Sequence, residues 1–139
     1  MFSVNRTACP LPLYREFADI LDEILQQHDA CNENESEISG IIINFRDPEY
    51  SAESGGYHPL EVMISNQGVI AYVTDFSYIG FPPYAELAKE LDFDFTYKLF
   101  GQMGRDYPLK EGAELFKLYQ RNFVDYFKSG VFEVSISTY

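Results

Sequence analysis

Apolar residues recur at helical spacing near the start of the chain, with acidic side chains on much of the remaining surface. The apolar positions are Leu13, Phe17, Ile20, Leu21, Ile24 and Leu25. This spacing predicts an amphipathic helix over residues 13–27 with an acidic outer side. Near the other end, a broad apolar face begins at Leu109 and predicts a second helix that ends at Gly130, because glycine commonly follows the last helical turn.

Alternating apolar and polar positions predict five strands. They cover residues 41–45, 60–64, 69–76, 93–99 and 132–136. Asn66-Gln67-Gly68 separates the second run from the third, so these two strands are expected to form a tight hairpin. Pro82-Pro83 predicts a short helix through about Glu90, since proline suits the first helical turn, and residues 101–108 predict a loop.

The order of these elements predicts an α+β fold. We expect a mainly antiparallel sheet of about five to seven strands, with the N-terminal and C-terminal helices packed on one side. A length of 139 residues suits a single domain over residues 1–139. Within it, residues 1–30 are expected to form an N-terminal amphipathic helix segment and residues 38–139 the sheet-containing body.

The chain is strongly acidic, with 22 Asp and Glu residues against 10 Lys and Arg and a formal net charge of −12. Direct nucleic-acid binding is therefore disfavoured, because it depends mainly on cationic side chains. Between Glu16 and Glu86 there are 14 acidic residues and a single base, Arg46. This excess indicates either a solvated surface or a face that attracts a basic protein or peptide, and spaced carboxylates also permit a decoy that mimics DNA.

Neither a signal peptide nor a membrane span is visible in the sequence. The N-terminal residues contain no sufficiently long apolar run, and no window approaches ~18 apolar residues, so we expect a cytoplasmic protein without membrane contact. Cys9 and Cys31 flank the first predicted helix and are expected to be reduced thiols. With His28 they offer at most three zinc ligands where a structural site usually takes four, so no metal or other cofactor is predicted.

The segment before the second predicted strand combines a hydroxyl, two glycines, carboxylates and a histidine. A small hydrolase centred on His58 would use Ser54 as its nucleophile. Glu53, Glu61 and Asp75 are the candidates for the carboxylate that orients the imidazole. The Gly-x-Ser-x-Gly motif of a nucleophile elbow is absent from the chain. A structural turn is the alternative interpretation, and we favour a protein without enzymatic activity.

Aromatic residues are dense between Tyr72 and Tyr84, on both sides of Asp75. Aromatic side chains often anchor interfaces, so this stretch predicts either core packing or an aromatic-lined groove with Asp75 at its rim. The polar, acidic residues 29–39 have no periodicity and predict a loop. Together with this loop and the segment around His58, the aromatic stretch defines the partner-binding candidates. These are Glu33, Glu35, Glu37, Tyr57, His58, Asp75 and Tyr78.

Three segments of the chain resemble a bacterial family known as domain of unknown function 2787. They are Asn44-Phe45-Arg46-Asp47-Pro48-Glu49-Tyr50-Ser51-Ala52-Glu53, Gly55-Gly56-Tyr57-His58-Pro59-Leu60-Glu61-Val62 and Tyr72-Val73-Thr74-Asp75-Phe76-Ser77-Tyr78. The resemblance extends from about Ile41 to Ser137 and implies no activity, cofactor or functional residue.

A looser resemblance comes from the acidic balance and the terminal helices, which are similar to those of the acidic mitochondrial matrix glycoproteins. That resemblance implies a trimeric ring whose subunits have seven-stranded antiparallel sheets and bind varied proteins. We therefore expect a self-associating, non-enzymatic protein with an acidic face for a basic partner.

Overall fold

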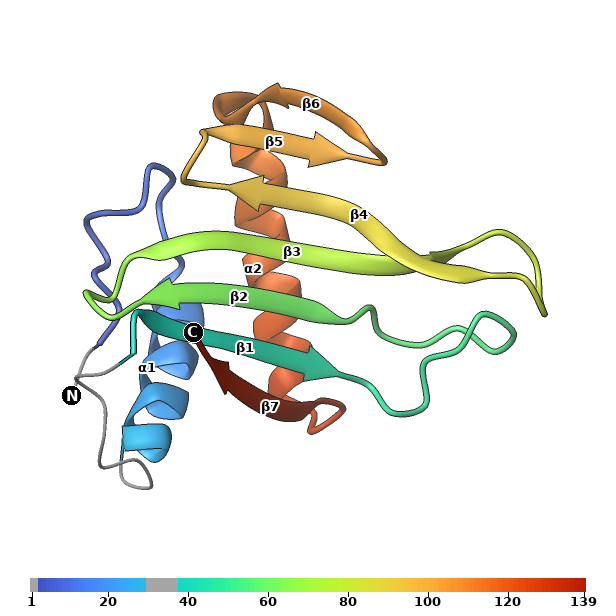
Figure 1. The fold of residues 1–139 in the computed structure, drawn as a ribbon, viewed down its shortest axis with the longest axis horizontal. Coiled ribbons are helices and arrows are strands. Elements are labelled where there is room, and N and C mark those ends of the chain that lie inside the picture. Colours follow the sequence, from blue (N-terminus) through green and yellow to red (C-terminus); the bar gives the residue numbers. More distant parts are fainter. Residues whose placement is uncertain (1–2, 30–37) are drawn as a thin grey trace.

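Two helices lie on one face of a seven-stranded antiparallel sheet in the computed structural model, which describes residues 3–29 and 38–139 (Figure 1). The sheet order is β6-β5-β4-β3-β2-β1-β7. In chain order the elements are α1 (Arg15–Asp29), β1 (Gly40–Arg46), β2 (Leu60–Ser65), β3 (Ile70–Ile79), β4 (Glu86–Asp94), β5 (Leu99–Gln102), β6 (Arg105–Pro108), the 3-10 helix η2 (Leu109–Gly112), α2 (Ala113–Lys128) and β7 (Glu133–Thr138). The predicted α+β class and the antiparallel sheet are confirmed.

The two faces of the sheet have different neighbours. Both helices lie behind the sheet in Figure 1, and no helix of the described residues covers the side toward the viewer. Successive side chains of a strand point to opposite faces, so β1 illustrates both sides. Ile41, Ile43 and Phe45 face the helices and are completely buried, and we call this side the covered face. Ile42 and Asn44 lie on the other side, which we call the open face.

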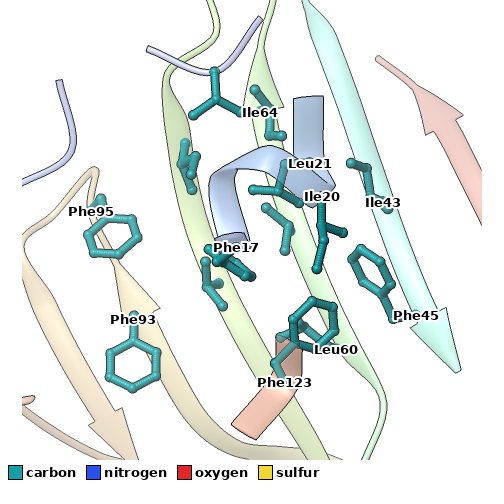
Figure 2. Packing of buried hydrophobic residues seen from close by; sticks show 14 of the residues in the cluster. Phe17, Ile20, Leu21, Ile43, Phe45, Leu60, Ile64, Phe93, Phe95 and Phe123 are labelled. Carbon is teal, nitrogen blue, oxygen red and sulfur yellow. The ribbon is translucent and has the colours of Figure 1, made fainter. Parts of the chain in front are cut away.

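An aromatic cluster joins both helices to β1 at the covered face. Phe45 of β1 lies edge-on to Phe123 of α2, with 4.8 Å between ring centroids. Phe17 of α1 lies edge-on to the same Phe123 ring at 5.5 Å. Figure 2 shows Phe17 and Leu21 of α1 among side chains of the central strands. The apolar stripe that predicts α1 in the sequence is therefore the side that α1 buries, and this burial is a main source of stability.

A single buried amide attaches the segment before α1 to α2. Gln120 is 1% exposed, and its side-chain oxygen accepts a hydrogen bond from the backbone N–H of Tyr14 at 2.6 Å. Its amide nitrogen donates to the carbonyl of Pro12 at 3.2 Å and to that of Phe116 at 3.3 Å. Because buried polar groups need partners, Gln120 holds the entry to α1 in place.

Both predicted helices and the predicted hairpin are confirmed, with small changes of their bounds. α1 begins at Arg15 rather than Leu13, and η2 precedes the C-terminal helix. The turn Asn66-Gln67-Gly68 joins β2 to β3, and Gly68 has φ of 80°. A Cβ at Gly68 would also collide with the carbonyl oxygen of Ser3, so glycine is required there for two reasons.

The short helix predicted after Pro82-Pro83 is wrong, because Glu86–Asp94 form β4. Leu87 and Leu91 are four residues apart, a spacing that fits one face of a helix as well as an irregular strand. β3 is ten residues long and pairs with β4 over most of this length. Pairing with β3 therefore makes this segment a strand, although the local spacing of its apolar residues also fits a helix.

Two further predictions near the sheet edge are wrong. The strand predicted over 93–99 is interrupted by a turn, in which the Asp94 carboxylate accepts the N–H groups of Thr96 and Tyr97. The loop predicted over 101–108 is the hairpin of β5 and β6, with positive φ at Met103 and Gly104. These corrections raise the count from five strands to seven.

Candidate functional site

A cavity of about 340 Å³ opens between the sheet, α2 and the start of β7. It is lined by Gly56, Tyr57 and His58 before β2, by Asp75 of β3, by Tyr119, Asn122, Phe123 and Tyr126 of α2, and by Phe132 before β7. A concave, mostly aromatic site with a few convergent polar groups is the usual form of a small binding site.

One wall of the cavity leads into a cluster of three ionisable side chains. The Nδ1 atom of His58 lies 3.0 Å from Asp75 Oδ1 and 2.9 Å from Glu90 Oε2. Asp75 is only 5% exposed, whereas the His58 and Glu90 side chains are about one third exposed, at 38% and 33%. The cluster therefore extends from the interior of the molecule to its surface.

An irregularity in the pairing of β3 with β4 places the second carboxylate. Asp75 is opposite Leu91 and Phe76 is opposite Lys89, so Glu90 has no partner in the register. An extra residue of this kind forms a β-bulge, which redirects a side chain and often occurs beside functional sites. Here the bulge allows Glu90 to reach His58 on the same side as Asp75.

Burial controls the electrostatics at the base of the cavity. It raises the pKa of Asp75 to about 6, although hydrogen bonds from His58 and from the Tyr119 hydroxyl act in the opposite direction. Burial, followed by the proximity of Asp75, raises the pKa of Tyr119 well above its ordinary value. Tyr119 therefore stays protonated and acts as a hydrogen-bond donor to Asp75 at neutral pH.

Stacked rings hold the histidine from its other side. His58 stacks on Tyr50 with 5.4 Å between ring centroids, and Tyr78 lies edge-on to the same Tyr50 ring at 5.1 Å. The backbone N–H of Tyr78 also donates a hydrogen bond to the Tyr50 hydroxyl. Across the cavity, Tyr57 packs against Tyr126 at 4.6 Å. Four predicted partner-binding residues, Tyr57, His58, Asp75 and Tyr78, thus belong to one region.

The predicted hydrolytic triad is only partly assembled. Among the described residues, Asp75 contacts His58, whereas no contact joins His58 to Glu53 or Glu61. Glu61 instead accepts a hydrogen bond from the Tyr72 hydroxyl. The Ser54 hydroxyl shares a hydrogen bond with Ser51 at 2.6 Å. No hydrogen bond joins Ser54 to His58 in the part of the chain that the structure describes.

The remaining sequence candidates fall elsewhere. Glu33, Glu35, Glu37 and Cys31 lie outside the described residues. Cys9 is partly buried, and burial raises the pKa of its thiol to about 11. Over residues 3–29 and 38–139, no helix is long and apolar enough to cross a membrane.

Three residues of the site, Glu90, Tyr50 and Tyr119, are not indicated by the sequence patterns. The local spacing predicts a helix that extends through about Glu90, and nothing in that pattern indicates a bulge. Tyr50 lies in a connection, where its contact with His58 depends on the path of the whole loop. Tyr119 belongs to the apolar face of a helix, and only its hydroxyl distinguishes it from a core residue.

Carboxylates also gather on the open face. Residues directly opposite one another in the register share a face, so they can be followed across the sheet. One such row contains Ser135, Asn44, Glu61, Thr74, Asp92, Gly101 and Asp106. The adjacent row contains Ser137, Ile42, Met63, Tyr72, Asp94, Leu99 and Pro108. These two rows hold four carboxylates and no Lys, Arg or His.

Comparison with known proteins gives a family and two close structural relatives, while no curated protein matches the chain. The hypothetical protein VC0508 from the VSP-II pathogenicity island of Vibrio cholerae is 33% identical, with a TM-score of 0.78 and 99% of each chain covered. The conserved hypothetical protein VC1805 from the VPI-2 island of Vibrio cholerae O1 biovar eltor is also 33% identical, with a TM-score of 0.77, covering 93% of this chain and 97% of that one. VC1805 is described as sharing structural homology with the human P32 protein. The model of a family of unknown function, DUF2787, matches residues 15–137, and the chain therefore belongs to the DUF2787 family.

Proposed function

We propose that this protein is a non-enzymatic binding module that docks a basic protein or peptide on the open face of its sheet. The observation that carries the proposal is the pair of cross-strand rows, in which Glu61, Asp92, Asp94 and Asp106 occur without any cationic residue. Carboxylates on adjacent strands produce a negative potential that attracts a cationic partner and accelerates its association.

The centre of the open face also has an apolar component. Ile42, Met63 and Tyr72 are directly opposite one another on three adjacent strands, and all three are only partly buried. An apolar centre next to charged residues is the usual composition of a protein interface. This arrangement supports a folded basic partner or an amphipathic basic peptide over a purely electrostatic ligand.

A charge-neutralised variant tests the proposal. Glu61→Gln, Asp92→Asn and Asp94→Asn together should slow association with an immobilised oligoarginine peptide several-fold and reduce its dependence on salt concentration. The matched control is Glu111→Gln, Glu114→Gln and Asp125→Asn, which changes the net charge equally at exposed positions on η2 and α2. Biolayer interferometry at several salt concentrations compares the two variants.

Equal slowing in the two variants would overturn the proposal, because it would indicate a general effect of net charge. A third variant, with Gln at Glu33, Glu35 and Glu37, tests whether this acidic segment contributes instead. Loss of binding in this variant alone would assign the interface to that segment. The same proposal includes a cytoplasmic location and self-association. Light scattering of the purified protein measures its oligomeric state directly.

A small hydrolase centred on His58 is the alternative function, and the contact between His58 and Asp75 favours it. The partnership of Ser54 with Ser51 favours the non-enzymatic proposal instead. We expect no turnover in a screen of esterase, phosphatase and glycosidase substrates. Turnover that disappears in His58→Ala, with the fold retained by circular dichroism, would establish the alternative.

A further inference from the structure

The cluster of His58, Asp75 and Glu90 has the composition and shape of a metal site. Each of the three side chains offers one ligand atom, and these atoms all lie within 4.8 Å of one another. We infer that the three side chains bind a divalent transition-metal ion of the zinc type. The inference is independent of the proposed function, because the cluster faces the cavity beside α2 rather than the open face.

The distances in the cluster agree with coordination by one ion. Zinc binds nitrogen and oxygen ligands at about 2.0–2.2 Å, so two ligands of the same ion at octahedral or tetrahedral angles are about 2.9–3.5 Å apart. His58 Nδ1 lies 2.9 Å from Glu90 Oε2 and 3.0 Å from Asp75 Oδ1. Both distances from His58 Nδ1 therefore match the separation of two ligands of one ion, and the two carboxylate oxygens lie within 4.8 Å of each other.

The surroundings of the cluster hold each ligand in position. The Tyr119 hydroxyl donates a hydrogen bond to buried Asp75, stacking on Tyr50 fixes the plane of His58, and the β-bulge directs Glu90. Partners of this kind orient the ligands and commonly alter metal affinity by about 10–100-fold. His58 and Asp75 both line the cavity, which provides room for water or a small molecule at a further coordination position.

Charge balance also favours a bound cation. Asp75 and Glu90 place two carboxylates together, and no Lys or Arg among the described residues forms an ion pair with either. His58 is their one ionic contact in the described chain. One imidazole nitrogen with two carboxylates suits zinc, cobalt or nickel, whereas calcium and magnesium prefer oxygen ligands alone.

Titration of metal-stripped protein with Zn²⁺ alone tests the inference. Isothermal titration calorimetry should give one ion per chain, and His58→Ala and Glu90→Gln should each weaken the affinity by about tenfold or more. Both side chains are partly exposed, so these variants are expected to fold, which their thermal midpoints verify. The wild-type midpoint should rise with Zn²⁺, and that rise should be reduced in both variants.

The competing thiol and histidine residues provide the control. A variant with His28→Ala, Cys9→Ser and Cys31→Ser should bind Zn²⁺ as the wild type does. The chain contains only two histidines, so NMR of the imidazole nitrogens separates the sites, and we expect Zn²⁺ to shift the His58 signals. The inference is wrong if Zn²⁺ does not bind, if the His28 signals alone shift, or if His58→Ala and Glu90→Gln retain full affinity.

Discussion

The covered and open faces of the sheet are built from the same strands but differ in composition. On the covered face, Ile43, Val62 and Val73 are completely buried beneath the helices. On the open face, the same sheet carries Glu61 on β2 and Asp92 on β4, which are only partly buried. The difference follows from the alternation of side chains along a strand, which gives each face its own set of residues.

Polar residues of the sheet are informative about function mainly where burial makes them unexpected. Acidic residues on the open face are consistent with a surface in water, and only their arrangement in rows suggests a partner. Asp75 is different, because it is an acidic residue on the covered face with 5% exposure. A buried carboxylate is costly, so its retention beside His58 and Glu90 marks the place where the apolar covered face becomes a site.

The largest contrast between the faces should appear in stability. Phe45→Ala removes a fully buried ring that contacts Phe123, Phe127 and Phe132, and should lower the free energy of unfolding by about 3–5 kcal/mol. Ile42→Ala, three residues earlier on the same strand but on the open face, should cost about 1 kcal/mol. Urea denaturation measures both variants, and similar losses would show that the open face is also a core.

The second largest effect should be a dependence of stability on pH, which arises from Asp75. Burial raises its pKa from the ordinary 3.8 to about 6 in the folded protein, so the folded state favours the protonated form. The stabilisation that protonated Asp75 gives to the folded state is therefore fully present below about pH 4 and is lost as the pH rises through 6. The loss corresponds to about 3 kcal/mol. Urea denaturation with a chelator present should show this slope in the wild type and not in Asp75→Asn, and identical slopes would contradict the prediction.

A polar residue on the helices should matter almost as much as the apolar core. Gln120→Ala leaves the N–H of Tyr14 and the carbonyl of Pro12 without their buried partner, and should lower the free energy of unfolding by about 1–3 kcal/mol. Hydrogen exchange should also increase at the start of α1. If exchange there stays slow in the variant, the segment is held by contacts other than Gln120.

The smallest effect is expected for a charge on the open face. Asp106→Asn removes an exposed carboxylate from the acidic row on β6 and should change stability by no more than about 0.5 kcal/mol. The thermal midpoint measures this change. A loss as large as that of Gln120→Ala would mean that the open-face charges contribute to the fold.

Local patterns in the sequence were sufficient for the elements whose periodicity is strong and whose turns are short. The stripe containing Phe17 and Leu21 predicts α1, and Asn66-Gln67-Gly68 predicts the hairpin of β2 and β3, because both signals lie within a few residues. The covered face of β1 follows in the same way from the alternation of Ile41, Ile43 and Phe45.

Tertiary structure decided β4 and the site that depends on it. The sequence predicts a short helix from Pro82-Pro83 through about Glu90, but pairing with the long β3 makes Glu86–Asp94 a strand. The bulge that places Glu90 exists only within that pair. His58 meets Asp75 although 17 residues separate them, and Glu90 comes from yet another strand. Residue types in the sequence indicated His58 and Asp75 as candidates, but their common site depends on contacts between distant segments, which local periodicity does not encode.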